Sequence, residues 1–211
     1  TNASKKILIG SHIDTVVCGG KYDGIAGVIS GLAIIKFLSD NDIKLPFDIE
    51  VYDYLGEELN DWNISCIGSR GICGTLSEGM LNRKNSKGIM LKDEIDRIGG
   101  NTKNINKLSN QFENVLACFE LHIEQGTTLE NKGIDIGVVE SMPNISRHKI
   151  LIEGQASHSG TTLMENRKDA LVVASKLIIF INKLAKEISQ KDNRHFVATV
   201  GKIEVSPNYV T

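Results

Sequence analysis

Four places in the sequence carry side chains that could bind a divalent metal ion. Two of them, His12 and Asp23, lie in the stretch GSHIDTVVCGGKYDG; the pair Glu57–Glu58 follows FDIEVYDYLG, and His122 follows NVLACFEL. Imidazole nitrogens and carboxylate oxygens suit Zn²⁺, Mn²⁺ or Co²⁺. Each group ends a strand-like run, and in open α/β sheets the loops at the carboxyl ends of strands meet in one crevice. We therefore expect these side chains to converge.

The acidic residues predict different roles within such a site. Adjacent carboxylates such as Glu57 and Glu58 repel each other unless a cation or a shared proton relieves them, so one is expected to bind metal and the other to act as general base. Asp23 has two oxygens and could bridge two ions. Asp14 points to the same side of an extended segment as His12, and we expect it to accept the second ring N–H of that histidine.

Each of these features has a simpler interpretation when taken alone. A His-x-Asp pair at a strand end is often structural, a Glu-Glu pair usually lies on the solvated surface, and His122 could be a buried core histidine. His148 and His195 are flanked by charged residues and are interpreted as exposed. Only the combination and order of the groups favour a metal site.

The elements expected to position this site form a strand–helix–strand unit. The runs KKILIG (5–10) and FDIEVYDYL (47–55) predict strands, and GIAGVISGLAIIKFLSDN (24–41) has helical periodicity. This order is typical of a mostly parallel sheet covered by helices. We also expect a helix over 90–98, a third strand that ends before His122, and another strand over 134–141.

The character of the sequence changes near residue 142, where Pro143 and Asn144 interrupt the chain. Strands are expected over 147–154 and 196–207, with a long amphipathic helix over 166–189 between them. The sequence thus predicts two domains, 1–141 and 142–211. The missing N-terminal methionine and the absence of polar tails suggest that both ends are cuts through a longer protein.

Composition excludes several classes of function. The 211 residues include 24 basic and 26 acidic side chains, for a net charge of −2, without a basic stripe that would bind nucleic acid. Polar residues interrupt every apolar run before the roughly 20 residues needed to span a bilayer. The four cysteines form no C-x-x-C pair, so thiolate zinc ligation is not expected and reduced thiols are. We expect a soluble, cytoplasmic protein.

Several motifs in a fixed order carry a family resemblance. The segments GSHIDTV, GGKYDG, GEE, ELHIEQGTTLE and SHSGTTLMENRKDA together resemble the M20 metallopeptidase-like amidohydrolases. Within them, HIEQG and HSGTTLM are similar to the branch of N-carbamoyl-L-amino-acid hydrolase, β-ureidopropionase and allantoate amidohydrolase. The resemblance runs from about Lys6 to Pro207. It implies an α/β fold: a mostly parallel-sheet, zinc-hydrolase-like catalytic domain with an inserted α+β lid or dimerisation domain, both incomplete here.

The resemblance also assigns roles to individual residues. His12 and His122 would hold one ion, Asp23 would bridge two divalent ions, and Glu58 would hold the second. Glu57 would be the general base and Gln125 would face the substrate.

In the lid domain, His158 resembles the histidine that stabilises the oxyanion from the partner subunit of a homodimer. These roles imply a metal-dependent hydrolase of C–N bonds in a small ureido or carbamoyl compound.

The sequence departs from the family pattern in places. After the Glu57–Glu58 doublet, Leu59–Asn60–Asp61 stands where a Gly-Ser-Arg-Phe-like stretch is usual in the family. Leu163 replaces the usual Pro. Thr211 stands about where a substrate-binding Asn is frequent. The C-terminal His ligand and the substrate-binding Arg of the family are missing, so we expect the isolated chain to be inactive. An aminoacylase or dipeptidase of the same fold, or a non-catalytic binding protein, remain the alternatives.

Overall fold

A computed structural model describes residues 5–107, 112–192 and 195–209. The chain divides into two compact units, residues 1–136 and 137–211, and each is described by itself.

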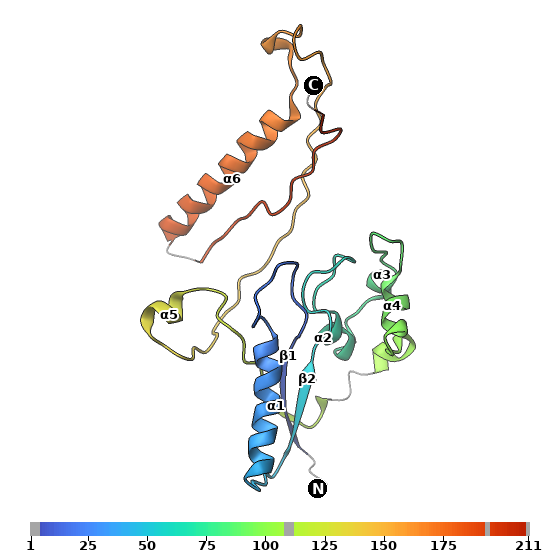
Figure 1. The fold of residues 1–211 in the computed structure, drawn as a ribbon, viewed down its shortest axis with the longest axis vertical. Coiled ribbons are helices and arrows are strands. Elements are labelled where there is room, and N and C mark those ends of the chain that lie inside the picture. The colour runs from blue at the N-terminus through green and yellow to red at the C-terminus, as the bar shows by residue number, and fades with distance from the viewer. Residues whose placement is uncertain (1–4, 108–111, 193–194, 210–211) are drawn as a thin grey trace. The chain divides into compact units, whose positions relative to one another are not determined.

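The first unit is built on a three-stranded parallel sheet in the order β2-β1-β3, of which Figure 1 labels β1 and β2. The strands are β1 (Lys6–Ser11), β2 (Asp48–Asp53) and β3 (Val115–Phe119). In the register of β1 and β2, Ile9 lies opposite Val51 and Ser11 opposite Asp53. Because β1 is central and pairs with both neighbours in parallel, all three strands end at the same edge of the sheet. The loops that follow the three strands therefore begin at this edge. In open α/β sheets, ligands bind in the crevice outside the carboxyl ends of the strands.

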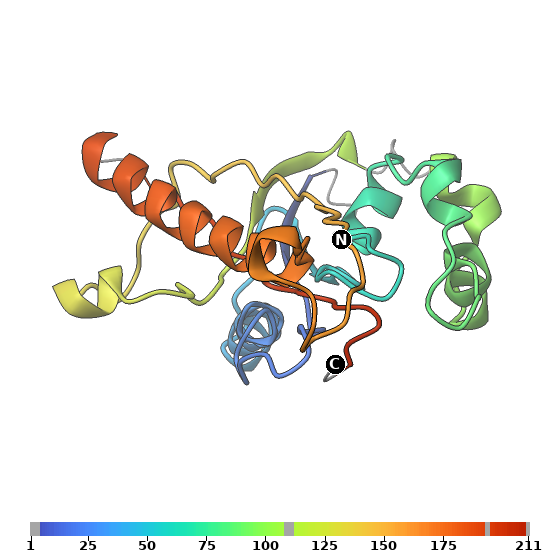
Figure 2. The same ribbon diagram turned by 90° about the horizontal axis from the view of Figure 1, so that it is seen from above.

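Helix α1 (Ile25–Asp40) connects β1 to β2 and packs against both strands. Gly31 allows the close approach, because a Cβ at this position would lie 3.0 Å from Val51 Cγ2 and 3.1 Å from Ile9 Cγ2. The helix ends at Asn41, whose side-chain amide donates to the Phe37 carbonyl at 2.8 Å. Figure 2, which views α1 nearly end-on, shows the helix lying beside the sheet.

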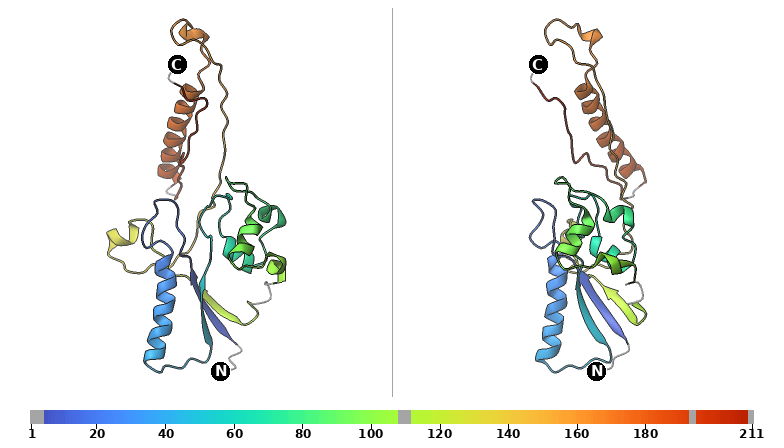
Figure 3. Two further views of the ribbon diagram at one scale, coloured as in Figure 1. Left: turned by 45° about the vertical axis from the view of Figure 1, so that its right-hand side comes forward. Right: turned by 90° about the vertical axis from the view of Figure 1, so that its right-hand side faces the viewer.

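A short-helix segment connects β2 to β3 and has its own small core. It contains α2 (Ile67–Ile72), α3 (Glu78–Leu81), α4 (Leu91–Arg97) and the 3₁₀ helix η1 (Thr102–Lys107), visible in both views of Figure 3. The buried side chains at its centre are Ile64, Leu76, Leu91 and Ile105. Trp62 packs against them, and its indole N–H donates to the Ile89 carbonyl at 2.9 Å. This core anchors the chain that follows the Glu57–Glu58 pair. After β3 the first unit ends with α5 (Thr128–Lys132).

The second unit contains the 3₁₀ helix η3 (Met164–Asn166) and the long helix α6 (Ala170–Asp192). An isolated antiparallel bridge joins Gln155 to Lys168, with the Gln155 amide donating to the Lys168 carbonyl at 2.9 Å. No helix among the described residues is long and apolar enough to cross a membrane.

The predicted α/β fold with a parallel sheet is confirmed, as are the strands at 5–10 and 47–55 and the helices over 24–41, 90–98 and 166–189, with small shifts at their ends. The strands predicted over 134–141, 147–154 and 196–207 are wrong for the described residues, because none of these segments forms a ladder with a neighbour. Alternating apolar residues favour an extended backbone, but a strand also needs a second backbone in register with it. The domain assignment 1–141 and 142–211 stays a prediction.

Candidate metal centre

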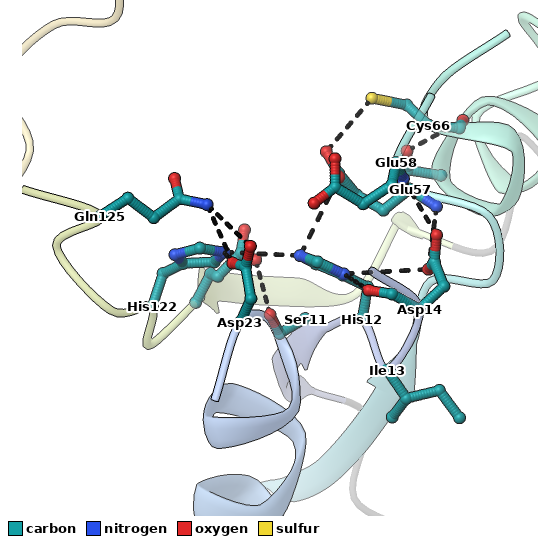
Figure 4. A network of polar contacts seen from close by, with 12 residues as sticks. Ser11, His12, Ile13, Asp14, Asp23, Glu57, Glu58, Cys66, His122 and Gln125 are labelled. Atoms are coloured by element: carbon teal, nitrogen blue, oxygen red, sulfur yellow. Dashed lines mark hydrogen bonds and ion pairs between the residues drawn. The ribbon is translucent and has the colours of Figure 1, made fainter. Parts of the chain in front are cut away.

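His12 follows directly after β1, and the fold buries it at the carboxyl edge of the sheet. Its side chain points into the site in Figure 4, and the residue is only 2% exposed. The ring Nδ1 lies 2.7 Å from the backbone carbonyl of Asp14. Because a carbonyl only accepts, a neutral ring here carries its proton on Nδ1 and presents a lone pair at Nε2. Nε2 is therefore the atom available to a cation.

His122 reaches the same place from the chain that follows β3. Its Nδ1 lies 2.9 Å from the Ile123 carbonyl, which fixes the same tautomer, and its Nε2 is 3.4 Å from Nε2 of His12. Two lone pairs facing each other at this distance repel. The Asp23 Oδ1 atom adds a third acceptor 3.3 Å from His122 Nε2.

These three residues fit a divalent cation. Their ligand atoms all lie within 4.8 Å of one another, the Asp23 side chain is almost fully buried, and each supplies an acceptor rather than a donor. Two imidazole nitrogens and one carboxylate are typical ligands of Zn²⁺, and they also suit Mn²⁺ and Co²⁺. A cation between them would replace repulsion between lone pairs by attraction to one charge.

A glycine makes the close approach at His12 possible. Gly24 has φ of +66°, and a Cβ on it would lie 2.4 Å from the His12 ring. Any other residue would combine a left-handed backbone with a steric clash. The loop that bears Asp23 can therefore pass directly over the imidazole only with glycine at position 24.

The Asp14 carboxylate organises the Glu57–Glu58 pair. It accepts the Glu57 amide at 3.1 Å and the Glu58 amide at 3.0 Å (Figure 4). Its Oδ1 atom is 3.8 Å from His12 Nδ1, so the carbonyl of Asp14 accepts the ring proton that we expected the carboxylate to accept. One residue thus orients the histidine through its backbone and both glutamates through its side chain.

The two glutamates occupy different environments. Glu57 Oε2 lies 3.9 Å from His12 Nε2, next to the proposed ligands. Glu58 lies outside the three-residue cluster, and its role as a ligand stays a prediction. Burial raises the pKa of the Glu58 carboxyl, and the negative charges of Glu57 and Asp23 raise it further.

Gln125 contacts the proposed bridging carboxylate. Its side-chain Nε2 donates to both Asp23 oxygens, at 2.9 and 3.1 Å, and its backbone has a φ of +54°. Because the carboxylate only accepts, the amide group must face it with its NH₂ end. The expected contact between Gln125 and substrate stays a prediction.

His158 lies in the second unit, and its tautomer is also defined. Its Nδ1 accepts the amides of Gly160 at 3.1 Å and Thr161 at 3.2 Å. The ring proton of the neutral form is therefore on Nε2, which makes this atom a hydrogen-bond donor. Arg167 braces the same turn by donating to the carbonyls of Ser159 and Thr162.

Sequence reasoning missed two contacts that support the site. Ser11, fully buried at the end of β1, donates its hydroxyl to Glu120 Oε1 at 2.9 Å and joins the two chain segments that carry the histidines. The Cys66 thiol lies 3.5 Å from Glu57 Oε1. The first could have been suspected because Ser11 and Glu120 each follow an apolar run and stand one and two residues, respectively, before a site histidine. No sequence pattern pointed to Cys66.

Comparison with known proteins defines the family. The profile of the peptidase family M20/M25/M40 matches residues 8–206, so the chain belongs to this family. It is 36% identical to a hydrolase of Haemophilus influenzae and 32% identical to the N-carbamoyl-L-amino acid amidohydrolase of Geobacillus stearothermophilus, over 95% of this chain and 48% of each relative. It is also 32% identical to the allantoate deiminase of Arabidopsis thaliana, over 87% of this chain and 36% of the relative.

A solved structure gives the same picture. The chain is similar to an amidase of the hydantoinase/carbamoylase family from Burkholderia vietnamiensis, with a TM-score of 0.71 and 30% identity over 98% of this chain and 48% of the amidase. The chain therefore spans about half the length of the relatives that it matches.

Proposed function

We propose that the protein is a metal-dependent hydrolase that cleaves a C–N bond in a linear ureido compound, namely an N-carbamoyl-L-amino acid or allantoate. The observation that carries the proposal is the convergence of the two Nε2 lone pairs of His12 and His122 with the Asp23 carboxylate at one edge of the sheet. The names of the relatives support the bond type and the substrate class.

His12, Asp23 and His122 would hold one divalent ion, and Asp23 and Glu58 would hold a second. A divalent ion at this place supplies Lewis-acid polarisation of the scissile carbonyl and lowers the pKa of the attacking water. Zn²⁺, Mn²⁺ and Co²⁺ all suit imidazole and carboxylate ligands of this kind.

Glu57 is the general base of the proposed reaction. Its Oε2 atom lies beside the proposed ligands, 3.9 Å from His12 Nε2, while the amides of the doublet are fixed by Asp14. Glu57 removes a proton from the attacking water and then passes it to the leaving nitrogen. With a carbamoyl amino acid the products are the amino acid, CO₂ and ammonia; with allantoate, ammonia leaves from a terminal ureido group.

His158 is the proposed oxyanion donor. Its Nδ1 is occupied by two backbone amides, so Nε2–H is the group that can donate to the oxygen that becomes negative. We infer that it acts across a homodimer formed through the second unit.

The proposal is tested on the protein expressed at its natural length. We expect turnover of N-carbamoyl amino acids or allantoate that is lost after treatment with a chelator and restored by Zn²⁺, Mn²⁺ or Co²⁺, and that Glu57→Gln lowers kcat at least about 100-fold. Hydrolysis of dipeptides or N-acyl amino acids in preference to ureido compounds would favour the aminoacylase alternative. Metal-independent turnover, or full activity in Glu57→Gln, would contradict the mechanism.

A further inference from the structure

We propose that Cys66 is a positioning residue for the general base: its thiol donates to Glu57 Oε1 and thereby directs Glu57 Oε2 toward the reacting water. This inference rests on the proposed function, because it assigns Cys66 a role only through Glu57. Figure 4 shows the contact, in which Sγ lies 3.5 Å from Oε1, within hydrogen-bonding range for sulfur.

The direction of this hydrogen bond follows from the chemistry of its partners. An ionised carboxylate accepts only, so the thiol must be the donor. Burial raises the pKa of the Cys66 thiol, and the nearby negative charge of Glu57 raises it further, so the group remains protonated at neutral pH. Cys66 is therefore a hydrogen-bond donor and not a nucleophile.

The backbone holds Cys66 in place for this contact. Its amide donates to the Glu57 carbonyl at 2.7 Å, so main chain and side chain both contact the same residue. Two further bonds continue from this one: the Ile67 amide donates to the Gly56 carbonyl and the Gly68 amide to the Leu55 carbonyl. The chain before the doublet is thus paired with the chain that enters α2.

The backbone conformation of Cys66 is unusual. It has φ of 59° and ψ of 39°, in the left-handed region that L residues with a Cβ adopt at a cost. Residues held in such conformations concentrate at functional sites. At this position the conformation brings the thiol to Glu57.

The two carboxylate oxygens of Glu57 therefore have different contacts and different proposed roles. Oε1 is engaged by the thiol, and Oε2 faces His12 Nε2 at 3.9 Å. A thiol is a weak donor, so it can orient the carboxylate while withdrawing little of the basicity that proton abstraction needs. A hydroxyl in its place would donate more strongly, and an aliphatic side chain would not donate at all.

The first arm of the test measures the contact without substrate. Alkylation of Cys66 and Cys73 by iodoacetamide is followed by peptide mass spectrometry in the wild-type protein and in Glu57→Gln. Removing the charge should lower the thiol pKa and raise the rate at Cys66 roughly 3- to 10-fold. Cys73, an exposed free thiol at the other end of α2, is the internal control and should not change. An unchanged rate at Cys66 would overturn the proposal.

The second arm measures catalysis and metal affinity in the natural-length protein. Cys66→Ala should lower kcat roughly 10-fold with KM within about twofold of wild type, and Cys66→Ser should recover kcat to within about threefold. Cys73→Ala should match wild type. Metal affinity by calorimetry should be unchanged in both Cys66 variants, whereas a loss would make Cys66 a ligand and overturn the proposal.

The two arms separate the possible failures. Wild-type kcat in Cys66→Ala, or no recovery in Cys66→Ser, overturns the positioning role while leaving the proposed function intact. If the wild-type protein hydrolyses neither ureido nor acyl substrates, the proposed function fails and the positioning role fails with it. In that case the alkylation rates still show whether the thiol and the carboxylate are in contact.

Discussion

The Nε2 atoms of His12 and His122 face each other at 3.4 Å although 110 residues separate the two histidines in the chain. The parallel pairing of β1 with β3 produces this proximity, because both strands deliver their following loops to the same edge. Each ring turns its Nδ1 proton to a backbone carbonyl, at Asp14 and Ile123 respectively. A pair of acceptors held in this way fits the divalent cation that we propose here.

Replacing His122 by alanine should therefore abolish tight metal binding. The change leaves Asp23 and His12 with one nitrogen ligand between them, and we expect the affinity for Zn²⁺ to fall at least about 100-fold. Isothermal titration calorimetry against the metal-stripped protein measures this directly. His148→Ala is the matched control, since His148 is exposed and lies in the other unit. Equal affinities in the two variants would exclude His122 as a ligand.

Substitution of Gly24 by alanine should destabilise the fold through His12. A Cβ would lie 2.4 Å from the imidazole, and the left-handed φ of +66° adds a backbone cost. We expect the free energy of unfolding in urea to fall by at least about 2 kcal/mol. Gly20→Ala in the same loop is the control, because nothing lies within 4 Å of its Cβ position, and its effect should stay within about 0.5 kcal/mol. If both variants lose a similar amount of unfolding free energy, the destabilisation comes from changing the loop and not from the contact with His12.

The core of the first unit was predictable because local pattern and topology agree there. The run around Ile7 and Leu8 and the helix over 24–41 define a strand–helix–strand unit, and that unit can only place β1 and β2 in parallel with their ends together. Once this is known, His12 and Asp23 must lie near each other. The family was predicted separately, from the resemblance that the motifs and their order carry.

Contacts that depend on side-chain direction were not predictable. The alternation of residues indicated that Asp14 lies on the same side of the chain as His12. In the structure, the Asp14 carbonyl accepts the ring proton of His12, and the Asp14 carboxylate accepts the amides of Glu57 and Glu58. The position of Cys66 depends on one left-handed residue. The strands expected in the second unit failed for a related reason, since pairing is a property of two segments and periodicity of only one.

Asp14→Asn should weaken the attachment of the glutamate pair while changing little else. Both carboxylate oxygens accept a backbone amide, and an asparagine must turn its NH₂ group toward one of them. The amide of Glu57 or of Glu58 then loses its acceptor, and the free energy of unfolding should fall by about 1–3 kcal/mol.

Urea denaturation of the metal-free protein tests this prediction without any contribution from bound ions. Asp40→Asn is the control, because Asp40 pairs with Lys36 on an exposed face of α1 and should contribute less than about 1 kcal/mol. If the two variants lose the same stability, the amide contacts of Asp14 are no stronger than a surface ion pair.

Arg167→Ala should loosen the turn that fixes the tautomer of His158. The guanidinium donates to the carbonyls of Ser159 and Thr162, and the same turn supplies the Gly160 and Thr161 amides to His158 Nδ1. The variant loses both arginine hydrogen bonds, each contributing about 1 kcal/mol. Hydrogen exchange at the Gly160 and Thr161 amides should therefore rise roughly 10-fold or more. Arg167→Lys keeps the charge but cannot form both bonds in the same planar geometry, so it should resemble alanine. Lys176→Ala, at an exposed position of α6, should leave the exchange rates unchanged. Wild-type exchange in Arg167→Ala would show that the turn holds His158 without the arginine.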